Sequence, residues 1–88
     1  MTDQAVEEFG TESLVGILQE LFGFPADVLA PTTTLDELGL DSLALLEMGA
    51  FLQERTGVEV GSRLGEVSRS APLEEVARTV AAFLAQGR

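Results

Sequence analysis

Three separate segments of the chain repeat apolar residues at intervals of three and four, and no other feature constrains the fold as strongly. The segments cover residues 3–22, residues 42–55 and the stretch from near Pro72 to Gly87. These intervals place apolar side chains on one face of an α-helix. A glycine follows each segment, as is usual after a helix C-terminus. The sequence therefore predicts an all-α fold with several amphipathic helices packed together.

The first predicted helix has three possible starting points. Gly10 and Gly16 disfavour helix, so it begins at Asp3, near Glu8 or at Thr11, and Gly23 and Pro25 follow its end. Its apolar stripe comprises Val6, Phe9, Leu14, Ile17, Leu18 and Leu21. In the last helix, the predicted core stripe comprises Leu73, Val76, Ala77, Val80, Phe83 and Leu84. Both stripes are wide enough to bury one face of a helix.

A long connection, residues 24–41, separates the first two predicted helices. Its prolines and the threonine run 32–34 oppose regular structure. It also carries apolar residues that a flexible tether would not need, and we expect all of them to pack onto the helices: Val28, Leu29, Leu35, Leu38 and Leu40.

The helix predicted over residues 42–55 has Asp41 in position to cap its N-terminus and Gly57 to end it. One face should enter the core, with Leu45, Met48, Gly49 and Leu52. Another arc mixes apolar and acidic side chains, namely Leu43, Leu46, Glu47, Ala50 and Glu54. Beyond this helix, we expect Val58 and Val60 to enter the core from an extended connector, and a short helical turn over residues 64–67.

Charge and missing residue types exclude several functions. The 88 residues carry a net charge of −10, which disfavours binding to nucleic acids and to anionic membranes. The chain has no cysteine and no histidine, so it lacks the usual nucleophile, general base and metal ligands of an autonomous enzyme. No Asp-rich loop supports an EF-hand. No apolar run suits a membrane span, and the N-terminus has no signal pattern, so we expect a cytoplasmic protein without metal.

The acidity is concentrated in one part of the chain. Residues 1–54 contain acidic side chains and no base, whereas all five arginines lie in residues 55–88. For Glu7, Glu8 and Glu12 we favour a solvated helix surface. Near Ser42, the acids are better interpreted as a docking surface for basic partners.

The segment 35–43, with the sequence LDELGLDSL, carries the most specific signal. With Asp41 as the cap, Ser42 becomes the first helical residue, beside unpaired backbone N–H groups that can hold a phosphoryl group. Gly39 permits a sharp turn, and Leu38 and Leu40 can anchor the loop. Without histidine, the serine cannot be activated from within the chain, so another protein must catalyse any reaction at its hydroxyl.

This segment resembles the phosphopantetheine attachment motif of acyl carrier proteins, and the similarity extends over nearly the whole chain. The resemblance implies a four-helix bundle with a long first loop and a short third helix, forming one domain over residues 1–88. It also implies that a phosphopantetheinyl transferase, using Mg²⁺, attaches 4′-phosphopantetheine from coenzyme A to the serine. The thiol of this arm then carries acyl chains as thioesters. The protein would be a covalent substrate shuttle and not an enzyme.

Matching the motif by position assigns roles to individual residues. Ser42 corresponds to the modified serine, and Asp41 to the motif aspartate that helps the transferase dock. By the same likeness, together with the charge pattern, the residues that meet partner enzymes are Leu43, Leu46, Glu47, Ala50, Glu54, Asp36 and Glu37. The residues implied to line the acyl-accommodating interior are Leu45, Leu52, Val60 and Val80. The expected partners are ketosynthase, acyltransferase and tailoring enzymes that present basic patches. We expect the carrier itself to be a monomer.

Two positions depart from the family pattern. Gly61 stands where many relatives have proline, which leaves the start of the third helix open. Ala71 precedes Pro72 where relatives often have serine or threonine, so the last helix should lack its usual side-chain cap unless Ser70 serves.

The chain begins with methionine and ends after its last helix, so we expect a free-standing carrier. The motif and the segment 54–58 look most like carriers of dissociated polyketide synthases, which implies polyketide and antibiotic biosynthesis. A discrete aminoacyl or peptidyl carrier of nonribosomal peptide synthesis is the runner-up, disfavoured by Leu40 in place of a second glycine, and a fatty-acid carrier is a further alternative. From a different class, a non-covalent acidic helical adaptor stays open.

Overall fold

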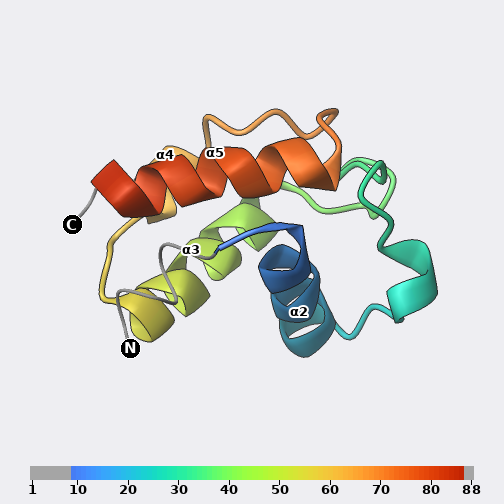
Figure 1. Cartoon of the computed structure of the whole chain (residues 1–88), viewed down its shortest axis with the longest axis horizontal. Coiled ribbons are helices and arrows are strands. Elements are labelled where there is room, and N and C mark those ends of the chain that lie inside the picture. The colour runs from blue at the N-terminus through green and yellow to red at the C-terminus, as the bar shows by residue number, and fades with distance from the viewer. Residues whose placement is uncertain (1–8, 87–88) are drawn as a thin grey trace.

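The computed structural model describes residues 9–86, which form helices and their connections. Three long helices and two shorter elements follow one another: α2 (Thr11–Phe22), η1 (Ala26–Val28, a 3₁₀ turn), α3 (Ser42–Thr56), α4 (Gly61–Leu64, a single turn) and α5 (Leu73–Gln86). In Figure 1, α5 runs across the bundle above α2 and α3, and the connection between α2 and α3 loops out at one end. The predicted all-α fold, with its long first loop and short third helix, is confirmed.

Helix α2 begins at Thr11, the latest of the three predicted starts. The Ser13 hydroxyl accepts a hydrogen bond from the Gly10 N–H at 3.3 Å, which helps to hold the first turn. Gly23 ends the helix in the left-handed conformation (φ 77°), and its N–H donates to the Gln19 carbonyl at 3.0 Å. The part of the prediction that covers residues 3–8 lies outside the described residues, as do Glu7 and Glu8. Glu12 is exposed.

Helix α3 confirms the predicted start, end and buried face. Its stripe of Leu45, Met48, Gly49 and Leu52 is buried, and Gly57 ends the helix with a φ of 77°. Through Gly49 of that stripe, α3 packs against α4. A Cβ added to Gly49 would lie only 2.5 Å from the Cα of Gly61, so the two backbones meet where neither residue has a side chain.

The short helical turn expected over residues 64–67 begins earlier, as α4, where the Val60 carbonyl accepts from the N–H groups of Arg63 and Leu64 at 3.0 Å. It continues through the predicted residues, since the Leu64 carbonyl accepts from the Val67 N–H at 3.1 Å. Gly61 allows the helix to begin directly against α3. Val58 and Val60 are buried, so the predicted role of the connector is confirmed.

The long connection packs onto the helices as predicted, with one exception. Leu29, Leu35 and Leu40 are buried, and Leu38 is half-buried. Val28 is 44% exposed, so its predicted burial is wrong. It closes the isolated turn η1, which has no buried residue, and the following Leu29 reaches the core in its place.

The same connection completes the N-terminus of α5. All six predicted core residues of α5 are buried. Ser70 does not cap the helix, since its hydroxyl pairs with that of Ser68 at 3.3 Å. The carbonyl of Thr33 accepts from the Leu73 N–H at 2.8 Å, and that of Pro31 accepts from the Glu74 N–H at 3.0 Å. Backbone groups of the connection therefore replace the missing side-chain cap. No helix within residues 9–86 is long and apolar enough to cross a membrane.

Candidate functional site

The candidate site is the N-terminus of α3, where Ser42 is the first helical residue and is exposed to solvent. Asp41 is the N-cap. Its carboxylate oxygen Oδ1 accepts from the Ala44 N–H at 3.0 Å, and its carbonyl accepts from the Leu45 N–H at 3.1 Å. This arrangement fixes the helix start immediately before the serine.

The helix start leaves donors next to the Ser42 hydroxyl. Among the described residues, the N–H groups of Ser42 and Leu43 make no hydrogen bond with the protein. They lie at the positive end of the dipole of a fifteen-residue helix. A phosphate ester on the serine oxygen would therefore find backbone donors and a favourable field, so the residues present fit such a group.

The loop before Ser42 is held by a compact turn. The Leu35 carbonyl accepts from the N–H groups of both Leu38 and Leu40 at 3.1 Å. Gly39 lies between them with a φ of 73°, a conformation that favours glycine. Leu35 is fully buried and Leu40 is 7% exposed, so both anchor the loop in the core. The serine is thus presented by backbone that is fixed on both sides.

Two predicted docking residues, Asp36 and Glu37, lie exposed in this turn. The Glu37 carboxylate accepts from the Thr34 N–H at 3.0 Å, while the Thr34 hydroxyl accepts from the Glu37 N–H at 3.1 Å. The backbone N–H of Asp36 donates to the Arg69 carbonyl at 3.0 Å. Glu37 therefore stabilises the loop as well as offering charge. The Thr-x-x-Glu spacing of residues 34–37 is typical of such a reciprocal pair of hydrogen bonds, but the sequence analysis did not predict the pair.

The remaining predicted docking residues form an exposed surface on α3. Leu43 and Leu46 are 63% and 55% exposed, and with Val28 they are the large apolar side chains that the described part of the chain exposes. The other three, Glu47, Ala50 and Glu54, are also exposed and line a shallow hollow of about 390 Å³ together with Leu21 and Phe51. The structure thus brings the α3 members of the predicted docking set together on one helix, beside α2.

The four residues implied to line an acyl interior lie in the packed core. Leu45, Leu52, Val60 and Val80 are between 0% and 4% exposed. Leu52 is the member of this set that also lines the groove between α2 and α3.

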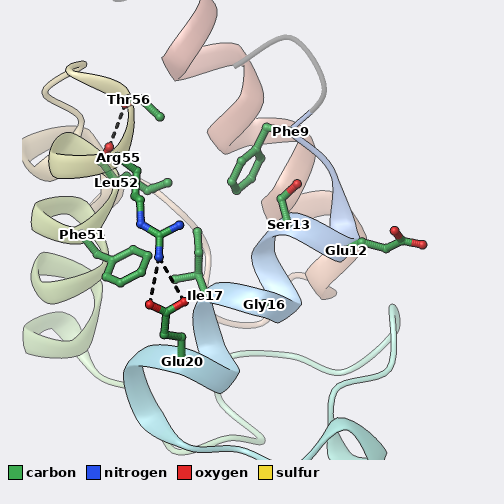
Figure 2. A pocket seen from close by; sticks show the side chains of 10 residues that line it. All are labelled: Phe9, Glu12, Ser13, Gly16, Ile17, Glu20, Phe51, Leu52, Arg55 and Thr56. Atoms are coloured by element: carbon green, nitrogen blue, oxygen red, sulfur yellow. Dashed lines mark hydrogen bonds and ion pairs between the residues drawn. The ribbon is translucent and has the colours of Figure 1, made fainter. Parts of the chain in front are cut away.

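That groove was not predicted. It has a volume of about 420 Å³ and lies where α2 passes the second half of α3 (Figure 2). The Nη2 atom of Arg55 donates to both carboxylate oxygens of Glu20 at 2.9 and 3.1 Å, and the guanidinium lies 4.6 Å from the centre of the Phe51 ring. The pairing joins residues 35 positions apart, so sequence spacing could not reveal it. The sequence feature that could have drawn attention to this pair is that Arg55 is the first basic residue in the chain.

Metal chemistry has no obvious donor set in the part of the chain that the structure describes. Residues 9–86 hold no group of three or more Asp, Glu, His or Cys side chains arranged to bind an ion.

Comparison with known proteins identifies the family of this chain. Triacetic acid lactone synthase cle1 from Aspergillus versicolor is 31% identical over 68 residues, which span 77% of this chain. The match covers only 4% of that much longer protein. No solved structure matches the chain significantly. Residues 12–67 match the family described as "Phosphopantetheine attachment site". This match covers most of the chain and includes the whole of the loop and α3, so the chain belongs to the phosphopantetheine attachment-site family of carrier domains.

Proposed function

We propose that this chain forms a single acyl-carrier domain in which Ser42 bears the 4′-phosphopantetheine arm. The observation that carries the proposal is the exposed Ser42 hydroxyl at the start of α3, next to the N–H groups of Ser42 and Leu43, which have no partner among the described residues. A phosphopantetheinyl transferase supplies the base and the metal for attachment, because the chain has no histidine. The arm supplies a thiol that carries acyl groups as thioesters. The protein acts as a substrate shuttle for other enzymes.

Docking of those enzymes uses the exposed surface around Ser42. Leu43 and Leu46 offer apolar contacts, and Asp36, Glu37, Asp41, Glu47 and Glu54 offer negative charge. Partner enzymes, such as a transferase, ketosynthase, acyltransferase or tailoring enzyme, would present basic patches. Association through exposed charges is fast and weakens as salt increases, which suits a shuttle that visits several enzymes.

Polyketide biosynthesis is the pathway that we propose. The relative from Aspergillus versicolor is a triacetic acid lactone synthase, and triacetic acid corresponds to three joined acetate units. Condensation of such units on a carrier thioester is polyketide chemistry. The likeness of the motif to carriers of dissociated polyketide synthases supports the same choice.

Intact-mass measurement tests the attachment. The protein is incubated with coenzyme A, Mg²⁺ and a broad-specificity phosphopantetheinyl transferase, and it should gain the mass of one phosphopantetheine group. Ser42→Ala should gain nothing, whereas the matched control Ser70→Ala, an exposed serine in the loop before α5, should be modified fully. No gain in the wild type would favour the non-covalent adaptor. A gain in Ser42→Ala would show that the site is elsewhere.

Cargo chemistry is tested on the loaded protein. A malonyl-specific acyltransferase should transfer malonyl groups to the arm, whereas adenylation enzymes that charge peptidyl carriers should leave it free. Efficient aminoacyl loading together with failed malonyl transfer would replace the polyketide proposal by the peptidyl one.

A further inference from the structure

The segment 34–40, which leads into Asp41 and Ser42, begins with two reciprocal hydrogen bonds. The Glu37 carboxylate accepts from the Thr34 N–H at 3.0 Å, and the Thr34 hydroxyl accepts from the Glu37 N–H at 3.1 Å. This is the arrangement of a capping box, which holds the first turn of a helix. Here the box holds a single turn, because the next α-helix, α3, begins at Ser42.

The same turn ends in a second pair of hydrogen bonds. The Leu40 N–H donates to the Leu35 carbonyl at 3.1 Å, and the Gly39 N–H donates to the Asp36 carbonyl at 3.0 Å. Gly39 has a φ of 73°. These features together form a Schellman motif, which is a common C-terminal cap of helices. The turn is therefore capped at both ends, and the residue that its second cap fixes, Leu40, is followed directly by the N-cap of α3.

The two caps of this turn depend on different groups. The C-terminal cap consists of backbone bonds, and its leucines are buried, with Leu35 0% and Leu40 7% exposed. The N-terminal cap depends on the side chains of Thr34 and Glu37, and Glu37 is exposed. Loss of the Glu37 carboxylate would remove the acceptor of the Thr34 N–H without disturbing a buried side chain. The order of the turn therefore depends on an exposed acid.

The neighbouring acid, Asp36, has a different environment. It is also exposed, but its carboxylate makes no hydrogen bond or ion pair within residues 9–86. Its backbone alone takes part in the loop, since its N–H donates to the Arg69 carbonyl at 3.0 Å. Asp36 and Glu37 thus carry the same charge at adjacent positions, but the carboxylate of Glu37 alone is bound by the turn.

The attachment reaction depends on how the serine is presented. The Ser42 oxygen forms a bond to the phosphorus that bears the pantetheine, and the diphosphate bond of coenzyme A breaks. The hydroxyl proton passes to the transferase, and adenosine 3′,5′-bisphosphate leaves with the electron pair of the broken bond. The attacking and leaving oxygens lie roughly in line in such a transfer, so a serine on disordered backbone reacts more slowly.

We propose that Glu37 is a positioning residue for phosphopantetheine attachment, because its bond to the Thr34 N–H orders the turn that presents Ser42 to the transferase. This inference rests on the proposed function and deepens it. A turn that is ordered before the two proteins meet does not have to be ordered during binding, which favours the reaction. Glu37 therefore acts through geometry as well as through its charge.

Rates of loading test the proposal, with the increase in intact mass followed over time at several carrier concentrations. Each variant is compared with the wild type at about 0.1 M and about 1 M salt, where the Debye lengths are about 10 and 3 Å. Glu37→Ala should lower kcat/KM about three- to tenfold at both salt concentrations, the size expected for a lost capping bond. Thr34→Val should have the same effect, although no charge is removed.

A matched pair of variants separates geometry from charge. Glu37→Gln removes the charge but keeps an oxygen that can accept from the Thr34 N–H, and glutamine is also found in capping boxes. Glu37→Asp keeps the charge on a side chain shorter by one methylene group. At high salt, Glu37→Gln should recover most of the rate lost in Glu37→Ala, and Glu37→Asp should recover less. Asp36→Asn, which removes the adjacent charge, should lose rate at low salt alone.

Amide hydrogen exchange reports on the turn itself. The Thr34 amide should exchange faster in Glu37→Ala and Glu37→Asp than in the wild type and Glu37→Gln, while amides in the middle of α3 and α5 keep their protection. Protected helix amides show that a variant is folded, so a slow reaction is then due to the turn.

Three outcomes would overturn the proposal. A loss in Glu37→Ala that disappears at high salt would make Glu37 a docking charge like Asp36. Better recovery by Glu37→Asp than by Glu37→Gln would lead to the same conclusion, and equal rates for all variants would show that the turn does not influence attachment. A wild type that gains no arm fails the proposed function, whereas one that is loaded at a rate insensitive to Glu37 fails this inference alone.

Discussion

Helix α3 packs differently on its two flanks, one of which faces α4 and the other α2. Towards α4, the paired glycines Gly49 and Gly61 bring two backbones into direct contact. Towards α2, the second half of α3 is held by long side chains, with Arg55 reaching Glu20 across a groove of about 420 Å³. One flank is closed by backbone contact between two glycines, and the other contains a groove that the Arg55–Glu20 pair spans.

This difference matters because Ser42 starts the helix that both flanks share. A closed contact resists any insertion, since overpacking a tight interface costs free energy. An open groove bordered by an exposed ion pair can admit a ligand at little cost, since such pairs contribute little stability. The two glycines of these helices therefore differ in their surroundings. A side chain at Gly49 would collide with Gly61, whereas an added Cβ at Gly16 would meet nothing within 4 Å.

Gly49→Ala should have the largest effect. Its methyl carbon would lie 2.5 Å from the Gly61 Cα, so α4 must move away from α3. We expect a loss of about 1–3 kcal/mol in the free energy of unfolding, more than the gain of about 0.5–1 kcal/mol from replacing a helical glycine. Urea denaturation followed by circular dichroism measures it. A stability equal to or above that of the wild type would show that the contact is not tight.

Asp41→Ala should have the next largest effect, because both flanks depend on where α3 begins. The Asp41 carboxylate accepts from the Ala44 N–H at 3.0 Å, and losing an N-cap costs about 1 kcal/mol. Asp41→Asn keeps a good cap without the charge, so it should keep nearly full stability in the same urea titration. Equal losses in the two variants would show that charge, and not the cap, stabilises the helix start.

The helices and their buried faces were predictable because they depend on local spacing. The period of the helix places Leu45, Met48, Gly49 and Leu52 on one face of α3, and this face is buried. Asp41 caps the N-terminus of α3, as expected of a short acidic side chain directly before a helix. The all-α fold, the long first loop and the short third helix followed from these features and from the family resemblance. The attachment of phosphopantetheine to Ser42 stays a prediction.

What could not be predicted depends on contacts between distant segments. The position of α4 is set by Gly61 meeting Gly49, and the start of α5 is completed by carbonyls of Pro31 and Thr33. Neither contact leaves a periodic pattern in the sequence. The groove likewise depends on how α2 crosses α3, and the spacing of residues within one helix does not predict this crossing. Val28 was predicted wrongly because apolar character alone does not say which side of an isolated turn faces the core.

Gly16→Ala should stabilise the protein, in contrast to Gly49→Ala. The added methyl group meets nothing within 4 Å, and alanine loses less conformational entropy than glycine in a helix. We expect a gain of about 0.5–1 kcal/mol in the free energy of unfolding, measured by urea denaturation. Opposite signs for the two substitutions would confirm that α3 is tightly packed at Gly49 and has free space beside α2 at Gly16. A loss at Gly16 would mean that the groove is filled by part of the chain, and the flank would then be closed as well.

Breaking the ion pair across the groove should have the smallest effect. Glu20 and Arg55 are both more than half exposed, so water and salt screen their attraction. A double-mutant cycle of Glu20→Gln and Arg55→Gln should give a coupling energy of about 0.2–1 kcal/mol at low salt, and less when salt is raised. A salt-insensitive coupling above about 2 kcal/mol, a size expected of buried partners, would show that this flank is closed in solution. A small, screened coupling means that a ligand can approach Arg55 without first breaking a strong contact, as an open flank requires.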